Sequence, residues 1–326
     1  KKYFYILFCL CLSSIIGHSQ NSAIDSLQNF LKTAQHDTII VNVLNDLFLE
    51  YEFDDQNKAG DCLSKALTIC KKTNYKKGFA TTYIHLGHFA QDKNNYQDAL
   101  SMYFKALEIY NFIGDQPGIA KAYNNIGIVH KNIGNYPEAL KYYFSSLKLK
   151  EKIGDKSGAA NSYNNIGNVY DAQGNYSEAI KNHIACLKIK QSFKLSNGEY
   201  ADKYSVATSY NNIGNAFFAL GNYAEALNNH SSSLKLKEQI NDKYGIGQSY
   251  NNIGAVYQLQ AEREKNIELS NEKYKLALNN YYASLRIDEE LEDIASVATS
   301  CNNIGSLLIK QKKYIEANEY LQRAKN

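Results

Sequence analysis

A short motif returns at regular intervals along the chain and limits the folds that the chain can adopt. YNNIG occurs four times and the variant CNNIG once, beginning at Tyr123, Tyr163, Tyr210, Tyr250 and Cys301. The motif glycines Gly87, Gly127 and Gly167 are 40 residues apart, and two later intervals lengthen to 47 and 51 residues. A period in the range of 20 to 50 residues indicates an array of stacked structural repeats.

An alanine follows the motif glycine by 12 residues in most copies, at Ala99, Ala139, Ala179, Ala226 and Ala317. In the sixth copy the alanine is Ala277, after an 11-residue insertion. Ala59 fits the same spacing if Leu47 stands at the glycine position. We therefore expect seven repeats, of which the first is degenerate.

The composition favours helices over strands. The 326 residues include only two prolines and 19 glycines, and 44% of them are hydrophobic. Tyr163, Ile166 and Tyr170 are three and four residues apart, as on one face of a helix. This spacing predicts a core-facing stripe. The segment GNY predicts the bend within a repeat, and aspartates in the turns between repeats, as in IGDKSG, are suited to cap the next helix.

Each repeat is thus expected to be a helical hairpin, with YNNIG on helix A and the alanine on helix B. We expect the motif glycine to let two helix backbones approach closely, and Leu47 to loosen the first repeat. His183 and His230 occupy one repeat position and are expected to replace the aromatic Tyr143.

The pattern resembles the tetratricopeptide repeat at Tyr163, Ile166, Gly167, Tyr170 and Ala179, and the likeness extends over roughly residues 38–326. The 40-residue period and the missing helix-closing proline are similar to the Pins/LGN and kinesin light chain variants. The resemblance implies an all-α fold, an alpha-alpha superhelix. Its repeats are expected at about 40–77, 78–117, 118–157, 158–204, 205–244, 245–295 and 296–326, the last incomplete.

The N-terminal segment predicts export. Residues 1–20 carry two lysines and an apolar run shorter than the ~20 residues of a membrane-spanning helix, which is typical of a signal peptide. The alternative is an uncleaved membrane anchor. Residues 21–37 are expected to form a capping helix, and the mature chain to be periplasmic or extracellular.

Several function classes are not favoured. The net charge of +3, with Lys and Glu interleaved, does not suggest a nucleic-acid partner, and we expect no membrane contact by the repeats. No convergent nucleophile, acid/base pair or cofactor motif is visible, and His85 with His88 is too little for a metal site. The chain is therefore not expected to be an enzyme. Cys62, Cys70, Cys186 and Cys301 are expected to be buried free thiols.

The paired asparagines need a separate explanation, because asparagine is a poor helix former. Their side chains point away from the core-facing stripe and toward the inner wall of the superhelix. An amide side chain can hydrogen-bond both the N–H and the C=O of an extended peptide. The resemblance implies that the second asparagine of each pair lines a concave peptide-binding groove. The expected binding residues are Asn125, Asn165, Asn212, Asn252 and Asn303, with Asn168 and Asn215 extending the wall.

The alternative is that the amides bond across neighbouring A helices and tie the stack together. We favour this alternative for the first asparagine of each pair: Asn124, Asn164, Asn211, Asn251 and Asn302. Elsewhere in the groove, Lys121 and Lys131 are expected to make the early part basic, and Phe218, Leu259 and Ile309 to make the later part apolar.

The expected function is that of a non-catalytic scaffold that holds a protein or peptide partner in its concave groove. The alternative is the extracytoplasmic sensory region of a larger transmembrane signalling protein, similar to sensor arrays of Bacteroidota-like bacteria. Because no polar terminal cap precedes Asn326, we expect a missing C-terminal segment. In the alternative, that segment would carry a membrane tether and a kinase, cyclase or transcriptional output.

Overall fold

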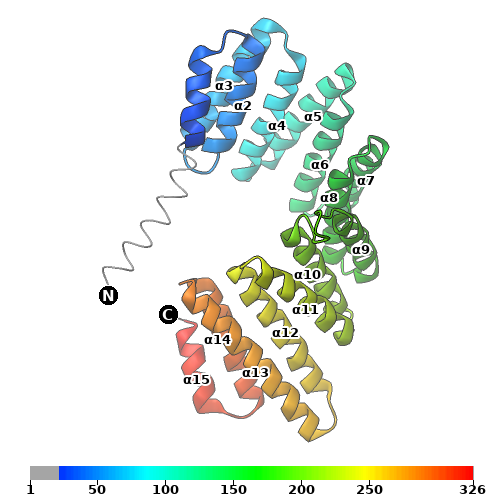
Figure 1. Cartoon of the computed structure of the whole chain (residues 1–326), viewed down its shortest axis with the longest axis vertical. Helices are drawn as coiled ribbons and strands as arrows, with labels where there is room; N and C mark the ends of the chain where they lie inside the picture. The colour runs from blue at the N-terminus through cyan, green and yellow to red at the C-terminus, as the bar shows by residue number, and fades with distance from the viewer. Residues whose placement is uncertain (1–21, 326) are drawn as a thin grey trace, which may run out of the picture. The chain divides into compact units, whose positions relative to one another are not determined.

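The computed structural model describes residues 22–325, which form α-helices joined by short connections (Figure 1). The predicted all-α class is confirmed, and the described residues contain no strand beyond an isolated bridge between Lys194 and Tyr200. The described residues form two compact units, residues 22–154 and residues 155–325.

The first unit consists of a helix at residues 22–33 and three helical hairpins. The hairpins are α2 (Asp37–Tyr51) with α3 (Gln56–Thr73), α4 (Lys76–Asp92) with α5 (Tyr96–Ile113), and α6 (Gln116–Asn132) with α7 (Tyr136–Lys152). Each hairpin also packs on the next, through α3 with α4 and α5 with α6. The even-numbered helices carry the motif and are the A helices, and the odd-numbered ones are the B helices.

The second unit repeats this arrangement with four hairpins in its described part. They are α8 (Lys156–Ala172) with α9 (Tyr176–Ser192), α10 (Lys203–Ala219) with α11 (Tyr223–Gln239), α12 (Lys243–Arg263) with α13 (Ile267–Glu290), and α14 (Ile294–Lys310) with α15 (Tyr314–Arg323). Successive hairpins pack through α9 with α10, α11 with α12, and α13 with α14.

The turns follow from local sequence. The predicted aspartate caps are confirmed: Asp115, Asp155 and Asp242 each accept a hydrogen bond from the backbone N–H three residues later. Inside the hairpins, the glycine of GNY adopts a positive φ, +72° at Gly174, and so ends helix A. The asparagine of GNY caps helix B in the same way, as Asn175 does for α9, a role that the sequence reading missed.

In most repeats the motif glycine makes room for a ring of helix B. A Cβ on Gly167 would lie 2.6 Å from Cε1 of His183, and a Cβ on Gly214 would lie 2.7 Å from Cε1 of His230. In each case the nearest atoms belong to the B-helix side chain four residues after the conserved alanine. The expected close approach of a helix B backbone is seen at Gly305, where an added Cβ would lie 3.3 Å from the backbone oxygen of Ala317; at Gly167 and Gly214 the nearest atoms belong to a ring instead. The aromatic role of His183 and His230 is confirmed.

In the first repeat, two leucines stand at the positions of the motif glycine and of the helix B ring. Leu47 stands at the glycine position, and Leu63 stands where later repeats place a ring; their exposed fractions are 2% and 0%. The larger residue on helix A compensates for the smaller one on helix B. Both leucines belong to one buried hydrophobic cluster, although Leu47 also lines an open hollow beside α3.

The two insertions lengthen the repeat in different ways. Residues 193–202 form a loop between α9 and α10. The second insertion extends the helices, so that α12 has 21 residues and α13 has 24, whereas α8 and α10 have 17.

Four cysteines, Cys62, Cys70, Cys186 and Cys301, are free and buried, as predicted. No helix within residues 22–325 is long and apolar enough to cross a bilayer. The predicted signal peptide, residues 1–20, lies outside the described residues.

Candidate partner-binding face

The paired asparagines of the second unit form an amide ladder between neighbouring repeats. The amide nitrogen of Asn212 donates to Oδ1 of Asn164 at 3.1 Å. The same bond recurs one repeat later and again after that, from Asn252 to Asn211 at 2.9 Å and from Asn303 to Asn251 at 3.1 Å. The second asparagine of one repeat thus always donates to the first asparagine of the repeat before it.

The ladder confirms the stacking role predicted for Asn164, Asn211 and Asn251. It also occupies the nitrogens of Asn212, Asn252 and Asn303, which were predicted to bind a partner. An amide oxygen is a separate acceptor, and none of these three oxygens receives a hydrogen bond from any described residue. All three side chains are half-buried, so the oxygens stay within reach of a ligand.

Asn125 in the first unit has a different partner. Its Nδ2 lies 3.0 Å from Nε2 of His88 on the preceding A helix. The residue that corresponds to a first asparagine there is Ile84, which offers no acceptor. Burial, followed by the nearby Lys121, lowers the pKa of His88 to about 4. Because the imidazole is neutral at pH 7, Nε2 accepts the hydrogen from Asn125. At 6% exposure, Asn125 is part of the packing.

The remaining predicted residues lie on α8 and α10. Asn165 is half-buried and interacts within the protein. Asn168 is half-buried and Asn215 is exposed, and neither has a hydrogen-bond partner among the described residues. These two side chains follow the motif glycine directly and are the freest of the predicted set.

The other side chains expected along the groove are also accessible. In the second unit Phe218 and Leu259 are half-buried, and Ile309 is 44% exposed. In the first unit Lys121 is exposed and Lys131 is half-buried.

A buried polar cluster extends the ladder into the packing of α13 and α14. Asn251 donates to Oγ of Ser300 at 3.1 Å, and Ser300 donates to Oδ2 of Asp288 at 2.6 Å. Ser284 donates to the backbone oxygen of Gly247 at 2.9 Å. Burial raises the pKa of Asp288. The sequence reading missed this cluster, although serine before the motif recurs at Ser162, Ser209, Ser249 and Ser300.

One titratable pair has a geometry that enzymes also use. Nε2 of His183 lies 2.9 Å from Oδ2 of Asp171. The His183 side chain is 0% exposed, so it cannot reach a substrate, and it fills the space over Gly167. Within the described residues, no three His, Cys, Asp or Glu side chains are grouped so that they could hold a metal ion.

Known solved structures share this architecture. A Pyrococcus horikoshii signal transduction ATPase with a tetratricopeptide repeat sensor aligns with a TM-score of 0.66 at 16% identity, over 95% of this chain and 47% of that one. The apo form of RapI aligns with a TM-score of 0.62 at 14% identity, over 87% and 96%. A Podospora anserina putative kinesin light chain with TPR-like repeats aligns with a TM-score of 0.51 at 15% identity, over 64% and 99%. No curated protein sequence matches the chain.

Family profiles match the sequence directly. A tetratricopeptide repeat profile matches residues 78–152, 118–192 and 205–266, which together are more than half of the chain. A second tetratricopeptide repeat profile matches residues 297–325. The chain belongs to the tetratricopeptide repeat family.

Proposed function

We propose that the chain is a non-catalytic scaffold that binds an extended protein segment along its A helices. The observation that carries this proposal is the row of ladder oxygens on Asn212, Asn252 and Asn303, which accept no hydrogen bond from the described protein. Asn168 and Asn215 add unpaired amides to the same helices.

The spacing of the ladder fits an extended backbone. Packed helices lie about 8–10 Å apart, and an extended chain rises about 3.3 Å per residue. Successive A helices therefore meet about every third residue of a bound segment. A ladder oxygen would accept one backbone N–H at each such point, while the residues between them present side chains for selection.

Apolar side chains on the ladder helices support a preference of the second unit for apolar segments. Phe218 on α10 and Leu259 on α12 are half-buried, and Ile309 on α14 is exposed. These apolar groups favour a segment with apolar side chains. Its backbone would supply the polar contacts, because the ladder oxygens can accept hydrogen bonds from backbone N–H groups.

A peptide selection tests the proposal. Random peptides displayed on phage are selected against residues 21–326, and the best binder is measured by calorimetry. The variant Asn168→Ala/Asn215→Ala should weaken binding about tenfold, as expected for two lost hydrogen bonds of about 0.5–1.5 kcal/mol each. Asn228→Ala, an exposed asparagine on the B helix α11, should leave binding unchanged. Equal affinity of both variants would reject the A-helix site.

A sensory role in a larger exported protein is our second proposal. The similarity to a Pyrococcus horikoshii protein that carries a repeat sensor supports it at the level of fold. Mass spectrometry of the exported protein tests cleavage after residue 20, and sequencing of the complete gene tests for an output domain. An intact N-terminus, or a gene without an output domain, would count against it.

A further inference from the structure

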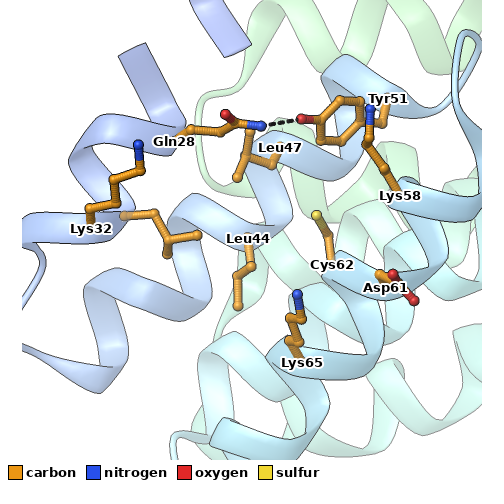
Figure 2. Close-up of a pocket in the computed structure, with 10 residues that line it drawn as sticks. Gln28, Lys32, Leu44, Leu47, Tyr51, Lys58, Asp61, Cys62 and Lys65 are labelled. Carbon is orange, nitrogen blue, oxygen red and sulfur yellow. Dashed lines mark hydrogen bonds between the residues drawn. The ribbon is translucent and has the colours of Figure 1, made fainter. Parts of the chain in front are cut away.

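An open groove is lined by residues of α2, α3 and the helix at residues 22–33 (Figure 2). It consists of two adjoining hollows of about 290 and 580 Å³. Both hollows are lined by Leu31, Leu44, Asp61 and Lys65. A volume of 300–1,000 Å³ is typical of sites for small organic ligands.

The groove has apolar walls along most of its length. Leu31 and Leu44 line both hollows, Leu47 lines the smaller one, and Ile40 and Ile69 line the larger one. The lining residues on α3 run from Lys58 to Ile69, about 16 Å at 1.5 Å per residue. The groove is therefore long and narrow, which suits a linear chain.

A hydrogen bond crosses the end of the smaller hollow. Nε2 of Gln28 donates to the hydroxyl of Tyr51 at 2.6 Å, as Figure 2 shows. This bond ties the helix at residues 22–33 to α2 and fixes one wall. Cys62, a residue that is 8% exposed, lines the same hollow, and burial raises the pKa of its thiol.

The charges at the groove are not balanced. Lys58 is paired with Asp55 at 3.0 Å. Lys65 has no ion pair within residues 22–325, and Lys32 contacts only the neutral side chain of Asn29, at 3.4 Å. Figure 2 shows the ammonium group of Lys65 pointing into the groove between Leu44 and Cys62, whereas Lys32 and Asp61 lie on opposite sides of it. An anionic headgroup complements this arrangement.

We propose that the groove binds a free medium-chain fatty acid. Its alkyl chain lies over Leu31, Leu44 and Leu47, and its carboxylate lies at Lys65, which lines both hollows. Burial of each CH₂ group contributes about 0.8 kcal/mol, so the chain supplies most of the affinity and Lys65 selects the carboxylate. This site is separate from the amide ladder, which lies in the other unit.

Titration calorimetry of residues 21–326 with dodecanoate, below its micelle concentration, tests the proposal. We expect one site, and at least tenfold weaker binding to Lys65→Ala. The matched control is Lys71→Ala, which removes one exposed lysine from α3 outside the groove and should bind as the wild type does. Absence of binding, or equal loss in both variants, overturns the proposal.

A fluorescent reporter separates this site from nonspecific uptake. The chain contains no tryptophan, and Ser64 is an exposed residue that lines the larger hollow. In Ser64→Trp, dodecanoate should shift the emission to shorter wavelength at saturation. Dodecyltrimethylammonium has the same chain and the opposite charge and should cause no shift. An equal shift with both compounds would show that no carboxylate is recognised and would overturn the proposal.

Discussion

Asn212 donates its amide hydrogen to Oδ1 of Asn164, a residue 48 positions earlier in the chain, at 3.1 Å. Because the same bond recurs between Asn252 and Asn211, the repeated sequence is also a repeated contact between helices. The paired asparagines therefore hold neighbouring A helices in register, and the oxygen of each donor remains available to a partner.

Breaking one rung of the ladder should destabilise the second unit. Asn164→Ala removes the acceptor of Asn212 and should lower the free energy of unfolding by about 1–2 kcal/mol. Urea unfolding of Asn164→Ala, Asn212→Ala and the double variant should give a coupling energy of at least about 0.5 kcal/mol. The exposed Asn215→Ala is the control, expected within about 0.5 kcal/mol of the wild type. Additive effects of the two rung variants would contradict the ladder.

A methyl group at the motif glycine should collide with the ring below it. In Gly214→Ala the new Cβ would lie 2.7 Å from Cε1 of His230. We expect a loss of about 1–3 kcal/mol in the free energy of unfolding, measured in urea. Gly60→Ala on α3 is the control, because its Cβ would lie 3.7 Å from Phe89, an ordinary contact. That change should be neutral or stabilising, since alanine favours a helix. A neutral Gly214→Ala would show that the ring has room to move.

Repetition made most of the fold predictable, because a position that recurs at one period must meet the same neighbours each time. The hairpins, the aspartate caps and the buried cysteines followed from that rule. The side chain that packs against the motif glycine could not be predicted in this way, because the pattern of helix A does not show which side chain of helix B lies against the glycine. The ladder was half predicted for the same reason: sequence places Asn211 and Asn252 on A helices but does not give the offset that pairs them.

Acid should weaken the fold through His230. Burial, followed by the positive charge of Lys237, lowers the pKa of His230 from its ordinary 6.5 to about 4. The folded state holds His230 in its neutral form. The contribution of His230 to the free energy of unfolding is therefore complete above pH 6.5 and declines as the pH falls toward 4. At pH 5 this loss is about 2 kcal/mol.

His230→Tyr tests this effect, because Tyr281 fills the equivalent position over Gly254. Urea unfolding at pH 7 and pH 5 should show a smaller loss in the variant than in the wild type. His85 and His88 are present in both proteins and contribute equally. An identical pH dependence of the two proteins would remove His230 as its source.

The first repeat contains a buried amide without a partner. Asn45 corresponds to the second asparagine of the motif, is 3% exposed, and neither of its polar side-chain atoms has a hydrogen bond. Asn45→Leu should raise the free energy of unfolding by about 1–2 kcal/mol, since an unpaired buried polar group is costly. Asn125→Leu at the equivalent position should do the opposite, because it leaves His88 without its donor. Thermal unfolding of both variants measures whether each change stabilises or destabilises the fold. A destabilised Asn45→Leu would mean that the Asn45 amide has hydrogen-bond partners.

The most direct test of the account compares two variant pairs in the same two assays, calorimetric binding of a selected peptide and urea unfolding. Asn168→Ala/Asn215→Ala should lose about tenfold in affinity and unfold as the wild type does, because these amides have no partner among the described residues. Asn164→Ala/Asn212→Ala should unfold at lower urea concentration, because it removes a rung of the ladder. If Asn168→Ala/Asn215→Ala unfolds early and still binds the peptide with wild-type affinity, the free amides belong to the stack and the proposed binding face is wrong.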